Sequence, residues 1–357
     1  MRNNFPALTA LRGLAAWWVV IYHFRELLNL SGLPALRIVA DHGYLAVDLF
    51  FIMSGFVIAL NYADGLRAPS IRTVARFLGF RLARIYPLHV VIMAAFITNP
   101  LAVSLFSQKG TPGTRYDPDY FLQSLFLIQN WGFGPGPAWN IPAWSISTEW
   151  GAYLVFPVLA WWLSRIVNPT QALAAMIGVL ILVIAAGFSV GGLGEDIAQA
   201  GLLRCLLEFS LGATVFRLHA LVAPWLPTAD AVFAVGLIVL AVGMMAEWPD
   251  YAFAPLAMLL VIIGLLDRHS IGARILTSKA LLYIGEISYS TYLVHYFIKD
   301  WSKFLLVGNG LPPATVFAAY LAITAAASVL LYHFVELPGR EWGRERVQVW
   351  FTRRQAA

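Results

Sequence analysis

The stretch ALTALRGLAAWWVVIYHF, from Ala7 to Phe24, is apolar over nearly its whole length and yet contains Arg12 and His23. A membrane-spanning α-helix needs about 20 mainly apolar residues. Apolar runs of similar length recur along the 357 residues, of which 60% are hydrophobic and only 12% are charged. Such a composition lies outside the usual range of soluble domains. The sequence therefore predicts an all-α integral membrane protein whose first span carries two ionisable side chains.

Ten apolar segments predict the spans of a polytopic helical bundle. If the N-terminus is cytoplasmic, most Lys and Arg residues fall on the cytoplasmic side, as the positive-inside rule requires. We therefore expect both termini in the cytoplasm, one membrane domain over residues 1–338 and a basic cytoplasmic tail over residues 339–357. The first span is long and charged, so it does not read as a cleavable signal peptide. The ten segments are residues 8–29, 43–63, 85–106, 144–164, 170–190, 199–219, 229–247, 251–267, 280–301 and 312–336.

The two ionisable residues of the first span are expected at different depths. With a helical rise of 1.5 Å per residue, Arg12 lies about 6 Å from the cytoplasmic end of the span and His23 about 22 Å from it. Their separation is close to three helical turns, so both side chains are expected on one face, about 16 Å apart. A charged side chain at the bilayer centre costs about 2.5–3.5 kcal/mol on insertion scales. Each residue therefore needs a partner, a cavity or a function.

Other ionisable residues fall into two layers by the same count. Asp48, Glu149 and His295 are expected at a depth similar to that of the histidine in the first span, towards the outer side. Arg81 and Arg84 are expected at the cytoplasmic mouth of the third span. Two plainer explanations stay open, since arginines near a span end can extend to the lipid headgroups and a buried histidine can hydrogen-bond a neighbouring helix.

The remaining polar residues indicate structure rather than chemistry. Arg204 and Glu208 are four residues apart on one predicted helix and are expected to pair. Cys205 is the only cysteine, so the sequence predicts neither a disulfide framework nor a metal site. His295 and Asp300 have the His-x4-Asp spacing of glycerolipid acyltransferases, but residues five apart face different sides of a helix, so we interpret the spacing as a coincidence. The net charge of +5 reflects basic cytoplasmic loops and does not predict binding to nucleic acid.

Six phrases, taken in order, resemble the membrane-bound acyltransferase-3 family over nearly the whole chain. The resemblance implies that Arg12 and His23 are the essential pair of that family, and that Arg81 and Arg84 are its basic pair at the cytoplasmic side. The phrases are LTALRGLAAWWVVIYHF, GYLAVDLFFIMSGFVIA, RFLGFRLARIYPLH, WSISTEWGAYLVFP, IGEISYSTYLVH and HFVELP.

The resemblance implies an enzyme of the bacterial inner membrane that transfers an acyl group, most often acetyl, from coenzyme A to a hydroxyl group. Acceptors in the family are commonly cell-surface or lipid-linked glycans, and some members modify macrolides or other secondary metabolites instead. The chain departs from the family pattern at Thr9, where many members have Asp, and at Ala46, where many have Gly. The C-terminal hydrolase-like domain of some members is not expected here. The sequence indicates neither the acceptor nor the oligomeric state.

The resemblance and the residues together predict how the acyl donor binds. We expect acetyl-CoA, a co-substrate rather than a resident cofactor, to dock from the cytoplasm with its phosphates held by Arg81, Arg84 and Arg12. Guanidinium groups suit this role because they form bidentate contacts with phosphate oxygens. The pantetheine arm then extends along the first span towards His23.

His23 is expected to act as the general base on the acceptor hydroxyl. Asp48 or Glu149 is expected to orient its ring, with His295 as an accessory residue of the same layer. Alternatively, His23 takes the acyl group itself and passes it on, and the sequence does not separate these two chemistries. A proton-coupled transporter that uses the same residues as a relay is the competing class, although the sequence shows no internal repeat of the kind found in many transporters.

Overall fold

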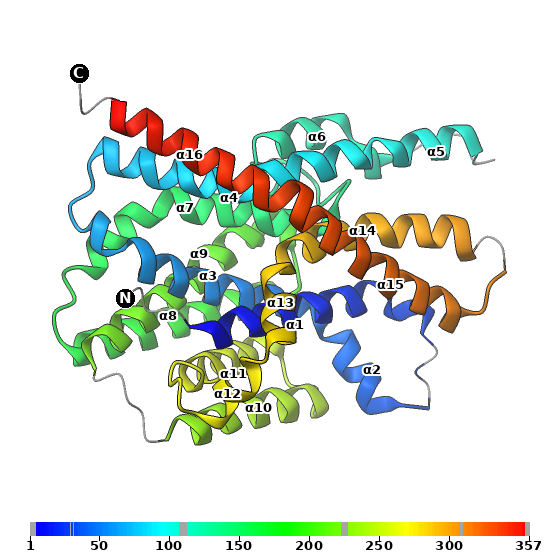
Figure 1. The fold of residues 1–357 in the computed structure, drawn as a ribbon. Coiled ribbons are helices and arrows are strands. Elements are labelled where there is room, and N and C mark those ends of the chain that lie inside the picture. Colours follow the sequence, from blue (N-terminus) through cyan, green and yellow to red (C-terminus); the bar gives the residue numbers. More distant parts are fainter. Residues whose placement is uncertain are drawn as a thin grey trace.

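The computed structural model describes residues 5–28, 30, 32–106, 113–222, 228–307 and 310–353, and within these ranges every regular element is a helix (Figure 1). This confirms the predicted all-α class. The longer α-helices are α1 (Pro6–Phe24), α3 (Ala46–Tyr62), α4 (Ile71–Phe96), α7 (Trp144–Leu163), α8 (Pro169–Val190), α9 (Ile197–Leu221), α10 (Ala229–Met245), α11 (Asp250–Gly264), α14 (Ser288–Ser302), α15 (Pro313–Leu331) and α16 (Leu337–Arg353).

Short helices connect the long ones. The short α-helices are α2 (Pro34–Asp41), α5 (Thr98–Phe106), α6 (Pro118–Leu125), α12 (Ile271–Leu276) and α13 (Lys279–Glu286). The 3-10 turns are η1 (Arg25–Leu27), η2 (Gly43–Leu45), η3 (Asp64–Leu66), η4 (Thr114–Tyr116) and η5 (Ile141–Ala143), and the π-helical turns are η6 (Lys303–Val307) and η7 (Tyr332–Glu336).

Helices overlap all ten predicted spans, but two of these spans are divided. The third becomes α4 and α5, with α4 beginning well before the predicted start, and the ninth becomes α13 and α14, which meet at Ile287. Within the part of the chain that the structure describes, five helical segments are long and apolar enough to cross a membrane: Pro6–Leu27, Pro34–Tyr62, Ile71–Phe106, Pro169–Val190 and Pro313–Thr352. The chain therefore has the character of a multi-pass membrane protein. The count of ten spans and the cytoplasmic position of both termini stay predictions, and Arg2 and Arg354, which belong to those predicted terminal segments, lie outside the described residues.

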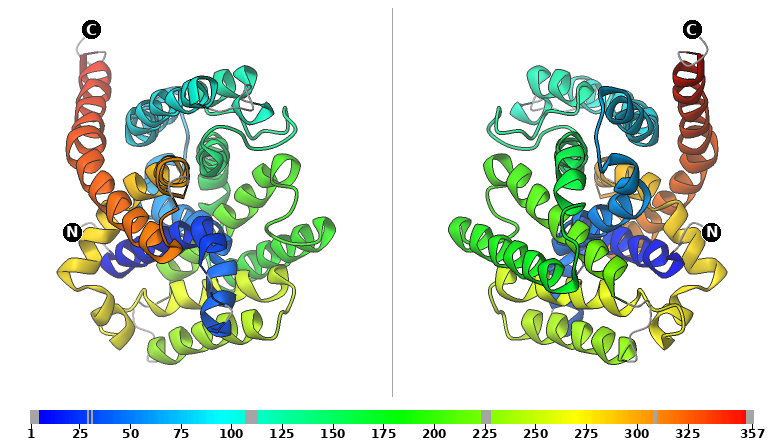
Figure 2. Two further views of the ribbon diagram at one scale, coloured as in Figure 1. Left: turned by 90° about the vertical axis from the view of Figure 1, so that its right-hand side faces the viewer. Right: turned by 90° about the vertical axis from the view of Figure 1, so that its left-hand side faces the viewer.

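The first helix lies in the middle of the bundle. Figure 2 shows α1 surrounded by other helices, and α1 packs against α3, α13 and α14. A Cβ atom on Gly13 of α1 would lie only 2.6 Å from the backbone nitrogen of Gly285, so the absence of a side chain here lets α1 and α13 approach closely. Such small-residue contacts are typical of helix packing in membranes. They place the charged face of α1 against the junction between α13 and α14.

A second close crossing joins α3 to α9. A Cβ atom on Gly55 would lie 1.8 Å from the carbonyl oxygen of Phe209, and one on Gly212 would lie 1.8 Å from that of Ile52. No side chain fits at either position without moving backbone, so the two glycines fix the separation of these helices. The crossing brings the polar residues of α3 and α9 into contact.

Helix α4 carries the predicted basic pair, and a cap at its start and a close contact with α16 hold it in place. It begins at a capping box in which the Ser70 hydroxyl accepts a hydrogen bond from the backbone nitrogen of Thr73, and the Thr73 hydroxyl oxygen accepts one from the backbone nitrogen of Ser70. Farther along, Pro87 packs against Gly339 of α16, where a Cβ atom would approach the proline ring to 2.6 Å. The adjacent helix α16, which contains most of the predicted basic tail, packs against α4 (Figure 2).

Candidate active site

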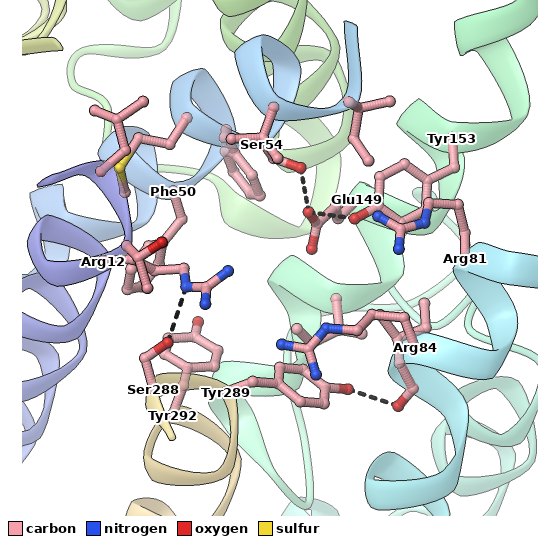
Figure 3. Close-up of a pocket in the computed structure, with 18 of the residues that line it drawn as sticks. Arg12, Phe50, Ser54, Arg81, Arg84, Glu149, Tyr153, Ser288, Tyr289 and Tyr292 are labelled. Carbon is pink, nitrogen blue, oxygen red and sulfur yellow. Dashed lines mark hydrogen bonds between the residues drawn. The ribbon is translucent and has the colours of Figure 1, made fainter. Parts of the chain in front are cut away.

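A cavity of about 440 Å³ lies between α1, α3, α4, α7 and α14 (Figure 3). Three guanidinium groups and one carboxylate face the same space, from residues far apart in the sequence. Its polar lining residues are Thr9, Arg12, Ser54, Asn61, Arg81, Arg84, Ser145, Glu149, Tyr153, Ser288, Tyr289 and Tyr292. The predicted set Arg12, Arg81 and Arg84 is thus brought together.

The junction between α13 and α14 holds Arg12 in place. Its Nε donates a hydrogen bond to the Ser288 hydroxyl oxygen at 3.0 Å, and its Nη2 donates one to the Gly285 carbonyl oxygen at 2.9 Å. That carbonyl belongs to the last turn of α13, where carbonyl groups lack the usual helical donor four residues ahead, and it also accepts from the Ser288 hydroxyl at 2.7 Å. The break in the predicted ninth span therefore creates the acceptor that orients Arg12.

Arg84 is neutralised inside the protein. It forms a buried ion pair with Glu336, and the other carboxylate oxygen of Glu336 accepts a hydrogen bond from the Ser290 hydroxyl at 2.7 Å. The guanidinium carbon of Arg84 also lies 5.3 Å from the centre of the Tyr289 ring. Arg84 is therefore fixed by partners from α14 and η7, and only part of its donor capacity faces the cavity.

Arg81 differs from Arg84, because it forms no ion pair with any of the described residues. Its guanidinium carbon lies 5.5 Å from the centre of the Tyr62 ring and 5.6 Å from that of Tyr153, and its Nε is buried without a hydrogen-bond partner among the described residues. None of the ion pairs found between described residues involves Arg81 or Arg12. Two cationic groups with unused donors thus face the cavity, which suits a ligand with an anionic group.

Glu149 belongs to this cavity and does not orient His23. Its Oε1 accepts hydrogen bonds from the Ser54 hydroxyl at 2.5 Å and from the Tyr153 hydroxyl at 2.6 Å. The expectation that Glu149 orients the His23 ring is therefore wrong, because the carboxylate faces the arginine-lined cavity and is occupied by two hydroxyl donors.

Asp48 is a structural residue in this fold. Its two carboxylate oxygens accept from Nε and Nη2 of Arg204 at 2.7 and 2.6 Å, and both side chains are buried. Glu208, the expected partner of Arg204, is more distant, at 3.9 Å. Asp48 is therefore not the partner of His23, because a bidentate contact with a guanidinium already occupies both oxygens. The close crossing of α3 and α9 favours the Asp48–Arg204 pair over the expected Arg204–Glu208 pair within α9.

The partner of His23 is His295. Nε2 of His295 lies 3.1 Å from Nδ1 of His23, and the same Nδ1 lies 3.1 Å from the Val19 carbonyl oxygen. Nδ1 of His295 lies 2.6 Å from the Tyr292 carbonyl oxygen. A carbonyl oxygen can only accept, so in the neutral rings both Nδ1 atoms carry the proton and Nε2 of His295 is the acceptor. Nε2 of His23 is then unprotonated and has no hydrogen-bond partner among the described residues.

The histidine pair borders the cavity without lining it. Tyr292 is the link, since its ring lines the cavity and its centre lies 5.9 Å from that of the His295 ring. The Tyr292 hydroxyl donates to the Pro142 carbonyl at 2.9 Å and lies 2.8 Å from the Ser145 hydroxyl. Its ring meets that of Phe50 edge to face, with centres 5.6 Å apart. Tyr292 and Phe50 thus form the end of the cavity nearest the two histidines.

A family model described as an acyltransferase domain matches residues 5–333. The chain belongs to the acyltransferase-3 family. It is 27% identical to Acyltransferase MdmB of Streptomyces mycarofaciens, over 96% of this chain and 94% of the relative. It is also 27% identical to O-acetyltransferase OatA of Staphylococcus aureus, over 95% of this chain and 57% of the relative. No solved structure matches the chain.

A third relative has a more specific name. The chain is 26% identical to "Putative peptidoglycan O-acetyltransferase YrhL" of Bacillus subtilis, over 95% of this chain and 55% of the relative. The chain therefore spans little more than half the length of OatA and YrhL. The family match, together with relatives named as O-acetyltransferases, shows that the protein is an acyltransferase.

Several residues of this acyltransferase site received no role from the sequence. Ser54, Tyr153, Ser288, Tyr292 and Glu336 hold the charged residues of the cavity in place or close its end. The sequence did contain a signal for these residues, since each belongs to one of the six phrases that carry the family resemblance. What the sequence could not indicate is which of these polar residues meet, because their contacts join segments far apart in the chain.

Proposed function

We propose that this acyltransferase lies in the bacterial cytoplasmic membrane and transfers an acyl group, most often acetyl, from acyl-CoA to a hydroxyl of a cell-surface or lipid-linked glycan. The observation that carries the proposal is the meeting of Arg12, Arg81 and Arg84 in one cavity whose lining includes Tyr292, the ring neighbour of His295. The names of OatA and YrhL support transfer of acetyl to oxygen.

The donor end of the proposal rests on charge. Coenzyme A carries phosphate groups, and Arg81 and Arg12 offer guanidinium groups that no carboxylate neutralises among the ion pairs of the described residues. The unpartnered, buried Nε of Arg81 fits a phosphate oxygen as its acceptor. From there the pantetheine arm has about 16 Å of helix to follow from Arg12 to His23. It reaches the histidine past Phe50 and Tyr292.

The chemical end of the proposal rests on Nε2 of His23. As a general base, this nitrogen accepts the proton of the acceptor hydroxyl while the oxygen attacks the thioester carbonyl carbon. The carbon–sulfur bond then breaks, and the CoA thiolate leaves with the proton that His23 holds. In the alternative chemistry, Nε2 attacks the thioester carbonyl carbon and the CoA thiolate leaves. The acceptor hydroxyl then takes the acyl group from Nε2, and its proton passes to the thiolate. Both routes need an unprotonated Nε2 beside the thioester.

His295 acts on His23 as a positioning residue in this proposal. Its Nε2 accepts from Nδ1 of His23 and so selects the tautomer that leaves Nε2 of His23 available. Its own Nδ1 is held by the Tyr292 carbonyl, within the helix that also lines the cavity. A neutral imidazole thus takes the orienting place that a carboxylate occupies in many histidine-dependent enzymes.

Release of CoA thiol tests the proposed function. Purified protein in lipid nanodiscs is incubated with acetyl-CoA and peptidoglycan fragments, and the free thiol is measured with and without the fragments. We expect thiol release that depends on the fragments and acetyl ester that appears on them. A transporter would consume no thioester. Thiol release that is no higher with the fragments than without them, and no higher than in His23→Ala protein, would overturn the proposal.

A further inference from the structure

A second cavity, of about 190 Å³, lies where α14 ends. It is lined by residues of α5, η4, the end of α14 and η6. Its lining combines cationic, anionic, amide and aromatic side chains. The residues that matter here are Asn99, Arg115, Tyr116, Asp300, Trp301 and Lys303.

These side chains hold one another in place. The Asp300 carboxylate accepts a hydrogen bond from Arg115 and another from the Asn99 amide at 3.1 Å. Nε1 of Trp301 donates to the Asn99 amide oxygen at 2.9 Å. Burial alone would lower the pKa of Arg115, but the hydrogen bond and the charge of Asp300 raise the pKa above its ordinary value, so the guanidinium stays charged. The polar groups are therefore fixed before any ligand arrives.

Such a set suits a sugar ring. The aromatic rings of Trp301 and Tyr116 offer flat apolar surfaces for the C–H faces of a pyranose. The amide, carboxylate and guanidinium groups retain donors and acceptors beyond the bonds they already make, and these can meet ring hydroxyls. Binding sites of this size are usually apolar surfaces with a few placed polar groups. A phosphate-rich ligand suits this cavity less well, because Asp300 offsets the charge of Arg115 within it.

The second cavity lies one aromatic ring away from His23. The guanidinium carbon of Arg115 lies 5.5 Å from the centre of the Tyr296 ring, and the edge-to-face contact between Tyr296 and His23 has its ring centres 5.2 Å apart. Lys303 makes a second link, because its Nζ lies 3.7 Å from a carboxylate oxygen of Glu26, which follows His23 by three residues. The Tyr296 ring therefore separates the cavity from the proposed catalytic histidine.

The two cavities meet the histidine pair through neighbouring turns of α14. Tyr292 lines the arginine-lined cavity and Tyr296 contacts Arg115 of the second cavity, and these tyrosines are four residues apart on α14. The His295 ring contacts both, with ring-centre distances of 5.9 Å to Tyr292 and 6.2 Å to Tyr296. Donor and acceptor can thus approach the same imidazole pair from two sides.

We propose that the second cavity, built around Trp301, Asp300, Asn99 and Arg115, binds a pyranose ring of the acceptor and presents its hydroxyl to His23. This inference rests on the proposed function, since it names the acceptor class and the place where that acceptor binds. In this arrangement the glycan binds outside the arginine-lined cavity, which binds the acyl-CoA donor.

Direct binding tests the site without any catalysis. The probe is the disaccharide N-acetylglucosaminyl-N-acetylmuramic acid, observed by saturation-transfer-difference NMR with protein in nanodiscs and no donor present. We expect a signal for the wild type and for His23→Ala, and its loss in Trp301→Ala and in Asp300→Asn. Trp248→Ala is the matched control, because Trp248 is an exposed tryptophan outside both cavities and its removal should leave the signal intact.

Kinetics of the same variants separate this inference from the proposed function. We expect Trp301→Ala and Asp300→Asn to raise the KM for the disaccharide at least about tenfold, while the KM for acetyl-CoA stays unchanged and so reports an intact donor cavity. An unchanged disaccharide KM in both variants, or no NMR signal in the wild type, would overturn the acceptor site and leave the acyltransfer proposal standing. Disaccharide binding that is lost in both variants, in a protein that releases no thiol, would support the site and reject the proposed function.

Discussion

Nε2 of His295 lies 3.1 Å from Nδ1 of His23, and this contact determines which nitrogen of His23 is available for chemistry. The two imidazoles come from α14 and α1, and each Nδ1 also lies beside a backbone carbonyl of its own helix. A carboxylate in this place would stabilise a charged imidazole, whereas a neutral imidazole only selects the tautomer. The site therefore favours a neutral base that is charged only while the reaction proceeds.

Replacing His23 tests whether its free nitrogen carries the reaction. We expect His23→Ala to lower acetyl transfer by about 10²–10⁴-fold, the usual contribution of general acid–base catalysis. The dissociation constant for CoA, measured by calorimetry, should not change, because His23 does not line the arginine-lined cavity. Transfer within a few-fold of the wild-type rate would show that another group acts as the base or nucleophile.

Replacing His295 tests whether it positions His23. We expect His295→Ala to lower kcat by about 10- to 100-fold, as loss of an orienting partner commonly does, with no change in the KM for acetyl-CoA. His295→Gln should recover part of the rate, because an amide oxygen can accept from Nδ1 of His23. His89→Ala is the control, since His89 is also buried but hydrogen-bonds the Ser124 carbonyl. Equal losses of kcat in the His89 and His295 variants would mean that both act only on folding.

Removing Arg81 tests the phosphate contact. We expect Arg81→Ala to weaken CoA binding about tenfold or more, since hydrogen bonds between charged groups contribute about 1.5–3 kcal/mol. The melting temperature should hold, because Arg81 has no ion-pair partner among the described residues. Arg76→Ala is the matched control, because Arg76 is an exposed arginine on the same helix and does not line the cavity. Equal affinity in the two variants would return Arg81 to a role at the lipid headgroups.

Removing Arg84 should give a different result, because its charge is already paired. We expect Arg84→Ala to lower the stability by about 3–5 kcal/mol, the usual cost of leaving a buried carboxylate without its partner. The double variant Arg84→Met, Glu336→Leu should recover most of that loss, as judged by thermal unfolding in detergent. Arg67→Ala is the control, because the Arg67–Asp64 pair is exposed and such pairs contribute at most about 1 kcal/mol. If Arg84→Ala and Arg67→Ala unfold at the same temperature, the Arg84–Glu336 pair does not stabilise the fold.

The sequence predicted the helices because apolar length is a local property, and the count of depth along each span placed Arg12, Arg81 and Arg84 in one cytoplasmic layer. The sequence predicted the partner of Asp48 incorrectly, because that partner is set by a contact between two helices. The identity of that partner depends on how closely α3 approaches α9, and this distance is fixed by Gly55 and Gly212, which pack against backbone rather than side chains. Once the helices touch there, the bidentate contact from Arg204 replaces the expected pair along one helix. Depth in the membrane could place His295 near His23 in height, but not in contact.

Asp48 provides the test that separates a structural carboxylate from a catalytic one at the same depth. We expect Asp48→Asn to lower the stability by about 3–5 kcal/mol, because it removes the bidentate counter-charge of the buried Arg204 guanidinium and leaves only the more distant Glu208, at 3.9 Å. The kcat of the protein that remains folded should stay within a few-fold of the wild-type value, since Asp48 touches neither histidine. The double variant Asp48→Leu, Arg204→Met should recover part of the lost stability and keep activity, because apolar side chains of similar volume can replace a buried ion pair, although Glu208 then lacks its cation. A stable double variant without activity would contradict this account and return Asp48 to the chemistry of His23.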